Sequence, residues 1–229
     1  MKPYAGYKEF MTDAPLKERV IAFLEKLIIE GDLKPRERLI ENEISRAFDV
    51  SRPPIREALR ALEGEGLVVS LPNRGVTVAE ITEKDVQNVY LIRANLESLA
   101  VKLATDNLTS EKHDFLESIY LLMVQKAKEG DLSSYFQMNR EFHETVLQAA
   151  DNEQLTRILR NLGKQTMPFR FFVISTPGML QKSLENHRNL LDALRARDGE
   201  RAGRLRYEQI QNGGQILRTR IHGFDLASL

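Results

Sequence analysis

Residues 40–78 read IENEISRAFDVSRPPIREALRALEGEGLVVSLPNRGVTV, and this stretch decides the fold of the N-terminal third of the chain. Its apolar spacing predicts two short helices, Glu41–Phe48 and a second one opened by Ser51, joined by a tight turn. Serine is a common helix N-cap, and Pro53 and Pro54 fall in the first turn, where a missing N–H costs little. The runs LVV and VTV then flank Pro-Asn-Arg-Gly, which is typical of a hairpin turn. The sequence therefore predicts a helix-turn-helix followed by a two-stranded wing.

The helix that begins after Ser51 has two distinct faces. Its apolar residues share one face, which we expect to be buried. Arg52, Arg56 and Arg60 recur every four residues along a neighbouring face. A guanidinium group can donate two hydrogen bonds to guanine O6 and N7, or contact a phosphate, so this pattern is typical of a DNA recognition helix. The alternative is a surface helix followed by an unrelated hairpin, but the cap, turn and strand signals all agree with the first interpretation.

Composition excludes several classes of protein. The chain has no cysteine, which excludes disulfides, thiolate catalysis and cysteine-ligated zinc. No run approaches about 18 apolar residues and no signal segment is recognisable, so we expect a cytoplasmic protein without membrane contact. The 33 Lys and Arg residues balance 33 Asp and Glu residues, so affinity for DNA would depend on local contacts. This balance argues against an architectural DNA-binding protein, which relies on neutralising phosphates.

Three regions are predicted along the chain. Residues 1–15 have no apolar period and are predicted to form a flexible arm. Residues 16–81 form the predicted winged helix-turn-helix domain, and residues 82–229 are helical in period throughout. Short breaks that contain Gly, Asp or Pro separate the helices, which predicts an antiparallel bundle and a mostly α fold class. The six bundle helices are predicted at 83–107, 110–129, 132–149, 152–172, 178–197 and 200–222.

The segment PRERLIENEISRAFDVSRPPIREALRALEGEGLVVSLPNRGVTVAEIT resembles the DNA-binding domain of the GntR family of bacterial transcription regulators. The resemblance covers residues 16–81 and includes the cap, helix, glycine and wing in order. It implies a symmetric homodimer, with each recognition helix in the major groove of half a palindromic operator. Many members have a hydroxyl residue where this chain has Pro53, so base preference does not follow from the family. The predicted contacts to DNA are Asn42, Arg46, Ser51, Arg52, Pro53, Pro54, Arg56, Asn73, Arg74 and Gly75.

The C-terminal region resembles the helical effector domain of the FadR-like (FCD) branch of that family. The resemblance rests on NREFHETVLQAADNEQL, ENHRNLLDAL and RARDGERAGRL. Many members of this branch hold a metal with an Asp or Asn and three His that face into the bundle. The resemblance implies that Asn139, His143 and His187 are metal ligands, for Zn²⁺ or Ni²⁺, but it aligns Gln209 with the third histidine. Amide oxygens are weaker ligands than imidazole for these metals.

Three interpretations of these four polar residues remain open. They hydrogen-bond to one another or to ordered water, they form a weak metal site that a ligand carboxylate completes, or they bind a ligand directly. Arg93 is a further candidate, because related proteins place an arginine facing the cavity and a guanidinium is well suited to clamp a carboxylate. The alternative for Arg93 is a surface ion pair with Glu97, four residues later.

Together these features predict a ligand-responsive transcription regulator, which in this family is more often a repressor than an activator. A small carboxylate would release it from its operator DNA. The alternative function is a metal-dependent enzyme that the DNA-binding module localises. It is disfavoured because the four polar residues include no carboxylate that could act as a general base. The predicted effector contacts are Arg93, Asn139, His143, His187 and Gln209.

Overall fold

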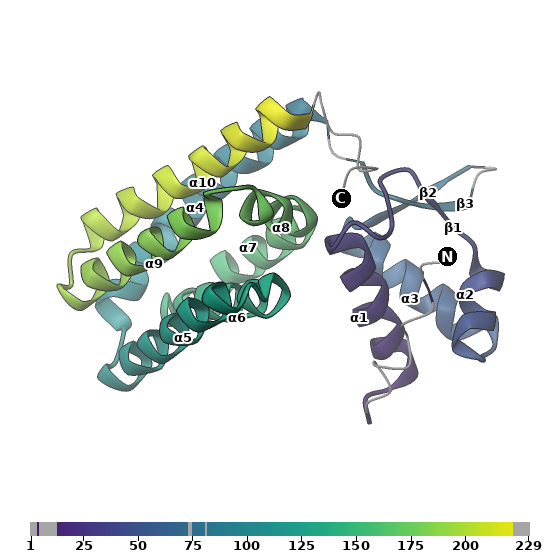
Figure 1. The fold of residues 1–229 in the computed structure, drawn as a ribbon, viewed down its shortest axis with the longest axis horizontal. Helices are drawn as coiled ribbons and strands as arrows, with labels where there is room; N and C mark the ends of the chain where they lie inside the picture. The colour runs from purple at the N-terminus through teal and green to yellow at the C-terminus, as the bar shows by residue number, and fades with distance from the viewer. Residues whose placement is uncertain (1–3, 5–12, 73–74, 81, 222–229) are drawn as a thin grey trace. The chain divides into compact units, whose positions relative to one another are not determined.

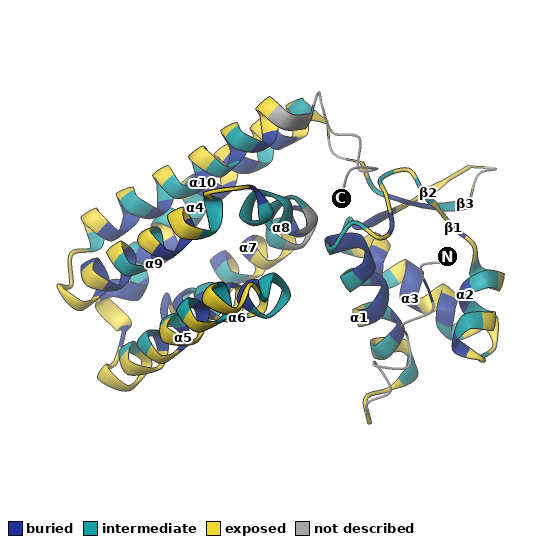
Figure 2. Ribbon diagram, viewed as in Figure 1, coloured by how far each residue is buried: buried dark blue, intermediate teal, exposed yellow. Residues whose placement is uncertain are grey.

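The computed structural model describes residues 4, 13–72, 75–80 and 82–221. The chain divides into two compact units, and the second unit begins at Thr82 (Figure 1). Each unit has an apolar core of its own, built from buried residues of that unit (Figure 2). The predicted fold class, a winged helix-turn-helix followed by a helical bundle, is confirmed.

The first unit combines three helices with a small antiparallel sheet. Its helices are α1 (Leu16–Ile29), α2 (Glu41–Phe48) and α3 (Arg52–Gly64), and its strands are β1 (Arg38–Leu39), β2 (Val68–Leu71) and β3 (Gly75–Val78). The left-handed conformation of Asp49, with φ 52° and ψ 47°, ends α2 and turns the chain into α3. Short polar residues such as aspartate tolerate this conformation better than most.

The sheet has one strand more than the sequence predicted. β3 lies in the middle and pairs with β2 on one side and β1 on the other, so that Thr77 faces both Val69 and Arg38. With two residues, β1 is too short to give a period-two signal. Two further backbone hydrogen bonds, from Arg36 to Val78 and from Val78 to Glu37, extend this connection. The wing is therefore attached to the segment that leads into α2.

The buried faces of α1, α2 and α3 meet in the core of this unit. The residues of α3 that the sequence assigned to its apolar face are all buried, with exposed fractions of 2% or less. Tyr4 is also buried in this core, although the sequence predicted a flexible arm for residues 1–15. Residues 1–3 and 5–12 of that arm lie outside the described residues. The four buried residues of α3 are Ile55, Ala58, Leu59 and Leu62.

From Thr82 on, the described chain is helical and belongs to the second unit, apart from residues 163–169, which are grouped with the first unit. Its helices are α4 (Glu83–Asn107), α5 (Ser110–Glu129), α6 (Leu132–Ala149), α7 (Glu153–Gln165), α8 (Met167–Ser175), α9 (Met179–Arg195) and α10 (Gly199–Ile221). Thr82 caps α4, as its hydroxyl accepts a hydrogen bond from the Asp85 amide and the Asp85 carboxylate accepts one from the Thr82 amide. None of the described helices is long and apolar enough to cross a membrane.

The single helix predicted at 152–172 is wrong, because the chain forms α7 and α8 in its place. Pro168 lies in the first turn of α8 and has no backbone N–H to donate, so it cannot continue the hydrogen-bond pattern of α7. The sequence contained this signal, but the apolar period continues across it. The break matters because α8 carries Arg170, one of the residues that line the cavity described below.

Helices α4 and α10 run side by side (Figure 1), and two adjacent glycines of α10 meet Tyr90 of α4 in different ways. A Cβ atom at Gly214 would lie 2.9 Å from Cδ1 of the Tyr90 ring, whereas one at Gly213 would lie 3.7 Å from the ring. Tyr90 is only 4% exposed and has little room to move. Its ring therefore packs directly on the backbone of α10 at Gly214.

We expect Gly214→Ala to destabilise the protein and Gly213→Ala to leave it unchanged or more stable. Overpacking a buried site costs about 1–3 kcal/mol, which exceeds the roughly 1 kcal/mol by which alanine favours a helix over glycine. At Gly213 only the favourable contribution applies. Urea denaturation followed by circular dichroism measures both variants. If Gly214→Ala and Gly213→Ala have equal free energies of unfolding, α4 accommodates the methyl group at position 214 at no cost.

Candidate DNA interface and ligand cavity

Helices α2 and α3 present most of the predicted DNA contacts to solvent. Exposed guanidinium and amide groups on adjacent helices are suited to contact phosphates and base edges. Gly75, at the start of β3, is also exposed and has φ 77°, whereas Asn73 and Arg74 lie outside the described residues. The exposed residues are Asn42, Arg46, Ser51, Arg52, Pro53 and Arg56, and Pro54 is half-buried. Their contacts to DNA stay predictions.

Glu41, the first residue of α2, binds two arginines of α3. Arg56 donates from Nε to Oε1 at 3.0 Å and from Nη2 to Oε2 at 2.9 Å, and Nε of Arg52 lies 3.8 Å from Oε2. The hydrogen bond from Arg56 lowers the pKa of the Glu41 carboxyl group, which is therefore ionised at neutral pH. This two-point contact fixes the direction of the Arg56 guanidinium. The sequence does not reveal this contact, because Glu41 and Arg56 are 15 positions apart and lie on different helices, on either side of the turn.

Ser51 occupies the N-cap of α3, with φ −70° and ψ 163°, but its side chain makes no capping hydrogen bond. A capping serine accepts a hydrogen bond from the N–H of the second or third helical residue. In α3 these residues are Pro53 and Pro54, which have no N–H. Ser51 therefore holds the predicted N-cap position, but the two prolines leave its hydroxyl no N–H from which to accept a capping hydrogen bond. The hydroxyl of Ser51 stays available at a helix N-terminus, a position suited to a phosphate oxygen.

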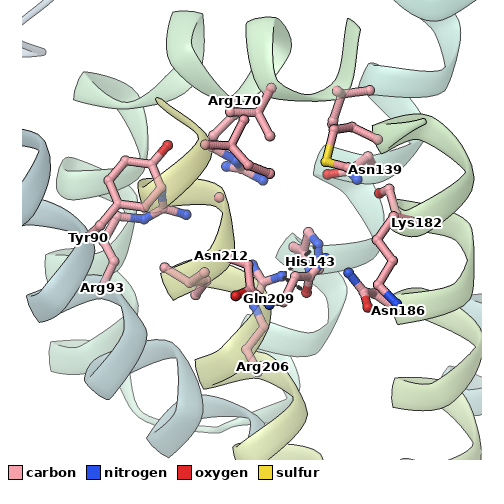
Figure 3. Close-up of a pocket in the computed structure, with 17 residues that line it drawn as sticks. Tyr90, Arg93, Asn139, His143, Arg170, Lys182, Asn186, Arg206, Gln209 and Asn212 are labelled. Carbon is pink, nitrogen blue, oxygen red and sulfur yellow. Dashed lines mark hydrogen bonds between the residues drawn. The ribbon is translucent and has the colours of Figure 1, made fainter. Parts of the chain in front are cut away.

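A cavity of about 330 Å³ lies within the second unit, lined by residues of α4, α6, α8, α9 and α10 (Figure 3). Four of the five predicted effector contacts line it: Arg93, Asn139, His143 and Gln209. The fifth, His187, is 1% exposed, and its Nε2 lies 3.2 Å from Nε2 of His143. The structure thus brings together the five residues that the family resemblance selected.

The cavity carries more positive charge than sequence analysis predicted. Besides Arg93 it is lined by Arg170 of α8, Arg206 of α10 and Lys182 of α9 (Figure 3). Arg206 is only 4% exposed, although it belongs to the arginine-rich run RAGRLR that looks solvated in the sequence. Composition does not indicate which arginine of such a run faces inward, so these residues were missed.

Glu97 is the carboxylate that binds two of these guanidinium groups. Arg93 donates to its Oε1 from Nε at 3.0 Å and from Nη2 at 2.6 Å, and Arg206 donates to its Oε2 from Nε at 2.8 Å. Burial alone would raise the pKa of Glu97, but the charges of Arg206 and Arg93 outweigh it and lower this pKa to about 2. Arg93 is 2% exposed, so the alternative of a surface pair with Glu97 is wrong.

His143 and His187 are neutral imidazoles at neutral pH. Burial lowers the pKa of both, that of His187 to about 4, and the charge of Arg206 acts in the same direction. Nδ1 of His187 lies 2.6 Å from the carbonyl oxygen of Ser183 and must carry its proton, so Nε2 has a lone pair. Nδ2 of Asn139 lies 3.5 Å from that Nε2.

This set of donors does not fit a divalent metal ion. Nη1 of Arg206 lies 3.1 Å from Nε2 of His143 and 2.6 Å from Oε1 of Gln209. A zinc ion about 2.1 Å from His143 would lie within roughly 5 Å of this guanidinium, and the proposed ligands include no carboxylate to offset the repulsion. The described residues contain no group of three or more His, Asp or Glu that could hold a metal. Asn139, His143 and His187 are better described as hydrogen-bonding partners, and the predicted zinc or nickel is not confirmed.

Two family models match the chain. The one described as bacterial regulatory proteins, gntR family, matches residues 16–78, and the one described as FCD domain matches residues 88–212. The chain belongs to the GntR family. Its members are transcription regulators and not enzymes, which removes the metal-dependent enzyme as an alternative.

Individual relatives agree with this assignment. The HTH-type transcriptional regulator YdhC of Bacillus subtilis (strain 168) is 32% identical over 181 residues, which cover 78% of this chain and 80% of YdhC. The gluconate operon transcriptional repressor of the same strain is 30% identical, over 80% of this chain and 74% of its own length. The solved structure of E. coli McbR/YncC has a TM-score of 0.79 and 27% identity, and covers 91% of this chain and 99% of its own.

We expect Arg56→Ala to weaken binding to a selected genomic DNA fragment by about 1–3 kcal/mol, because Arg56 is predicted to pair with a base. Binding to a scrambled duplex should change less. Fluorescence polarisation with both duplexes measures the two affinities. Arg195→Ala, at an exposed arginine of α9, removes the same charge from the second unit and is the control. Unchanged discrimination between the duplexes in Arg56→Ala would exclude Arg56 from base reading.

We expect the free energy of unfolding to fall as pH falls from about 6.5 to about 4, in part through His187. In this window the unfolded chain binds a proton at this residue that the folded protein, with a His187 pKa of about 4, does not. The loss at pH 5 is about 2 kcal/mol, because one pKa unit corresponds to about 1.4 kcal/mol.

His187→Asn is the matched variant for this effect, since its amide can still donate to Ser183 but does not titrate. Urea denaturation at about pH 7 and about pH 5 compares it with the wild type. The variant should lose less stability on acidification. An equal loss in both proteins would contradict a buried, neutral His187.

Proposed function

We propose that this GntR-family protein is a ligand-responsive repressor, which leaves its operator when a small carboxylate binds in the cavity of the second unit. The observation that carries this proposal is the charge of the cavity. Three guanidinium groups, those of Arg93, Arg170 and Arg206, line the cavity, but only Arg93 and Arg206 contact a carboxylate, that of Glu97, which leaves a surplus of two positive charges. Charges with little access to water are costly unless they are paired. An anionic ligand would supply the missing partner.

Arg170 is the residue best placed to bind that ligand. Among the described residues no carboxylate lies within salt-bridge distance of it, although Arg93 and Arg206 both have Glu97. Desolvation, together with the charges of Arg93 and Arg206, lowers the pKa of Arg170 to about 9, so it is still protonated at neutral pH. A ligand carboxylate could accept two hydrogen bonds from this guanidinium.

The DNA-binding part of the proposal concerns α2, α3 and the wing turn. Reading a palindromic operator requires a homodimer whose recognition helices are about 34–36 Å apart, so a small change in the relative position of these helices would lower affinity for DNA.

Exposed apolar side chains on α4 and α5 offer a surface for this dimer. A cytoplasmic protein would have direct access to bacterial DNA. The exposed apolar residues are Leu91, Ile92 and Leu99 of α4 and Leu121 and Leu122 of α5.

The test begins with genomic fragments that the purified protein selects, which are sequenced to give an operator. Mono-, di- and tricarboxylates are then screened for a rise in melting temperature and for release from that operator. We expect one class of carboxylate to do both and to weaken DNA binding at least about tenfold, or about 1.4 kcal/mol.

Arg170→Gln should abolish both effects without unfolding the protein, because it removes a charge that has no carboxylate partner. Arg195→Gln, outside the cavity, should retain both effects. A carboxylate that raises the melting temperature but leaves operator binding unchanged would disprove ligand-controlled release. Turnover of that carboxylate would contradict a purely regulatory role.

A further inference from the structure

We propose that Arg206 supplies the positive charge that a divalent metal would otherwise supply in this cavity, and that the protein binds its anionic ligand without a metal. The part that concerns the ligand rests on the proposed function. The part that concerns the metal does not, because it follows from the contacts of Arg206 alone.

The guanidinium of Arg206 contacts the side chains that a metal would need. Nη1 lies within hydrogen-bond distance of both Nε2 of His143 and Oε1 of Gln209, at 3.1 and 2.6 Å. Figure 3 shows the Arg206 side chain extending from α10 beside both groups. A guanidinium can only donate hydrogen bonds, so Nη1 donates one hydrogen to Nε2 of His143 and the other to Oε1 of Gln209. Two of the four groups that would coordinate a metal are therefore already bound to a cation.

The protonation states of the two histidines agree with this assignment. His143 accepts at Nε2 from Arg206, and His187 has its proton on Nδ1, directed at Ser183, which leaves a lone pair on its Nε2. Both imidazoles therefore direct lone pairs to the same region, 3.2 Å apart. Each lone pair has a donor nearby: Nη1 of Arg206 donates to His143, and Nδ2 of Asn139 lies 3.5 Å from Nε2 of His187.

Glu97 holds Arg206 in this position. Its Oε2 accepts hydrogen bonds from both Nε and Nη2 of Arg206, and both side chains are largely buried. Four of the five N–H groups of Arg206 are thus used, two by Glu97 and one each by His143 and Gln209. A metal ion could reach His143 and Gln209 only if Nη1 of Arg206 moved away from both, and the hydrogen bonds of Nε and Nη2 to Glu97 oppose that movement.

The absence of a metal would change how the protein contacts its ligand. A metal would coordinate a carboxylate oxygen directly, whereas the guanidinium groups of this cavity bind it through hydrogen bonds. Arg170 and Arg93, which also line the cavity, can act together with Arg206 on one anion. Removing metal ions from the protein should therefore leave ligand affinity unchanged.

Zinc titration of the tag-free, full-length protein by calorimetry tests the metal part, with Zn²⁺ alone as the probe. Three proteins are compared: the wild type, Gln209→His, and the double variant Arg206→Met with Gln209→His. We expect the double variant to bind one zinc ion at least about 100-fold more tightly than the wild type, because it has three imidazoles and no competing cation. Gln209→His, which keeps Arg206, should stay within about threefold of the wild type.

Two results would overturn the proposal. One is stoichiometric, tight zinc binding by the wild type, and the other is a gain in Gln209→His as large as that in the double variant. Circular dichroism checks that each variant folds. If the double variant does not fold, the wild type and Gln209→His still decide the outcome, since tight binding by either contradicts the role of Arg206.

The ligand part is tested by repeating the carboxylate melts in excess EDTA. We expect the rise in melting temperature to be the same with and without the chelator. Loss of the rise in EDTA would overturn metal-independent binding. If no carboxylate stabilises the protein at all, the proposed function fails. The zinc titration then still decides whether Arg206 takes the place of a metal ion beside His143 and Gln209.

Discussion

The carboxylate of Glu97 lies between the guanidinium groups of Arg93 and Arg206, and the chemistry of the second unit depends on this contact. It connects α4 to α10, two helices that also meet where Tyr90 packs on Gly214. A buried cation is tolerated only with a partner, so one acid allows two arginines to point inward. With both of its oxygens engaged, Glu97 has no position left for Arg170. The cavity therefore carries more positive charge than its one neighbouring carboxylate offsets.

The first unit could be predicted almost completely from the sequence, because its signals are local. Apolar spacing indicated α3, and a glycine-containing turn indicated the wing. Among the differences, β1 depends on a contact between distant residues, whereas the others have local causes. β1 is two residues long and is defined only by its pairing with β3. The hydroxyl of Ser51 makes no capping hydrogen bond because two prolines follow it. In the rest of the chain, α7 and α8 divide at Thr166, two residues before Pro168, although the apolar spacing continues across this position.

The cavity could be predicted only in part. Resemblance to relatives located Asn139, His143, His187 and Gln209, but a resemblance selects positions that relatives share. Arg206 lies three residues before Gln209 on the same helix, so helical geometry already places both on one face. The sequence could not show that its side chain contacts Glu97, 109 positions away. Ion pairs between distant residues inside a helical bundle leave no recognisable pattern in the spacing of apolar residues or in the amino-acid composition.

The pair formed by Glu41 and Arg56 has a consequence for how the protein searches DNA. An unpaired surface arginine displaces condensed counterions from any duplex and so strengthens binding to every sequence. An arginine whose charge a carboxylate already balances releases fewer counterions, yet it can still offer its remaining N–H groups to a base edge. In a helix that reads DNA, such a pair would favour discrimination between sequences over binding to every duplex. In a protein of zero net charge, this would raise the ratio of specific to non-specific sites occupied, even when non-specific sites greatly outnumber operators.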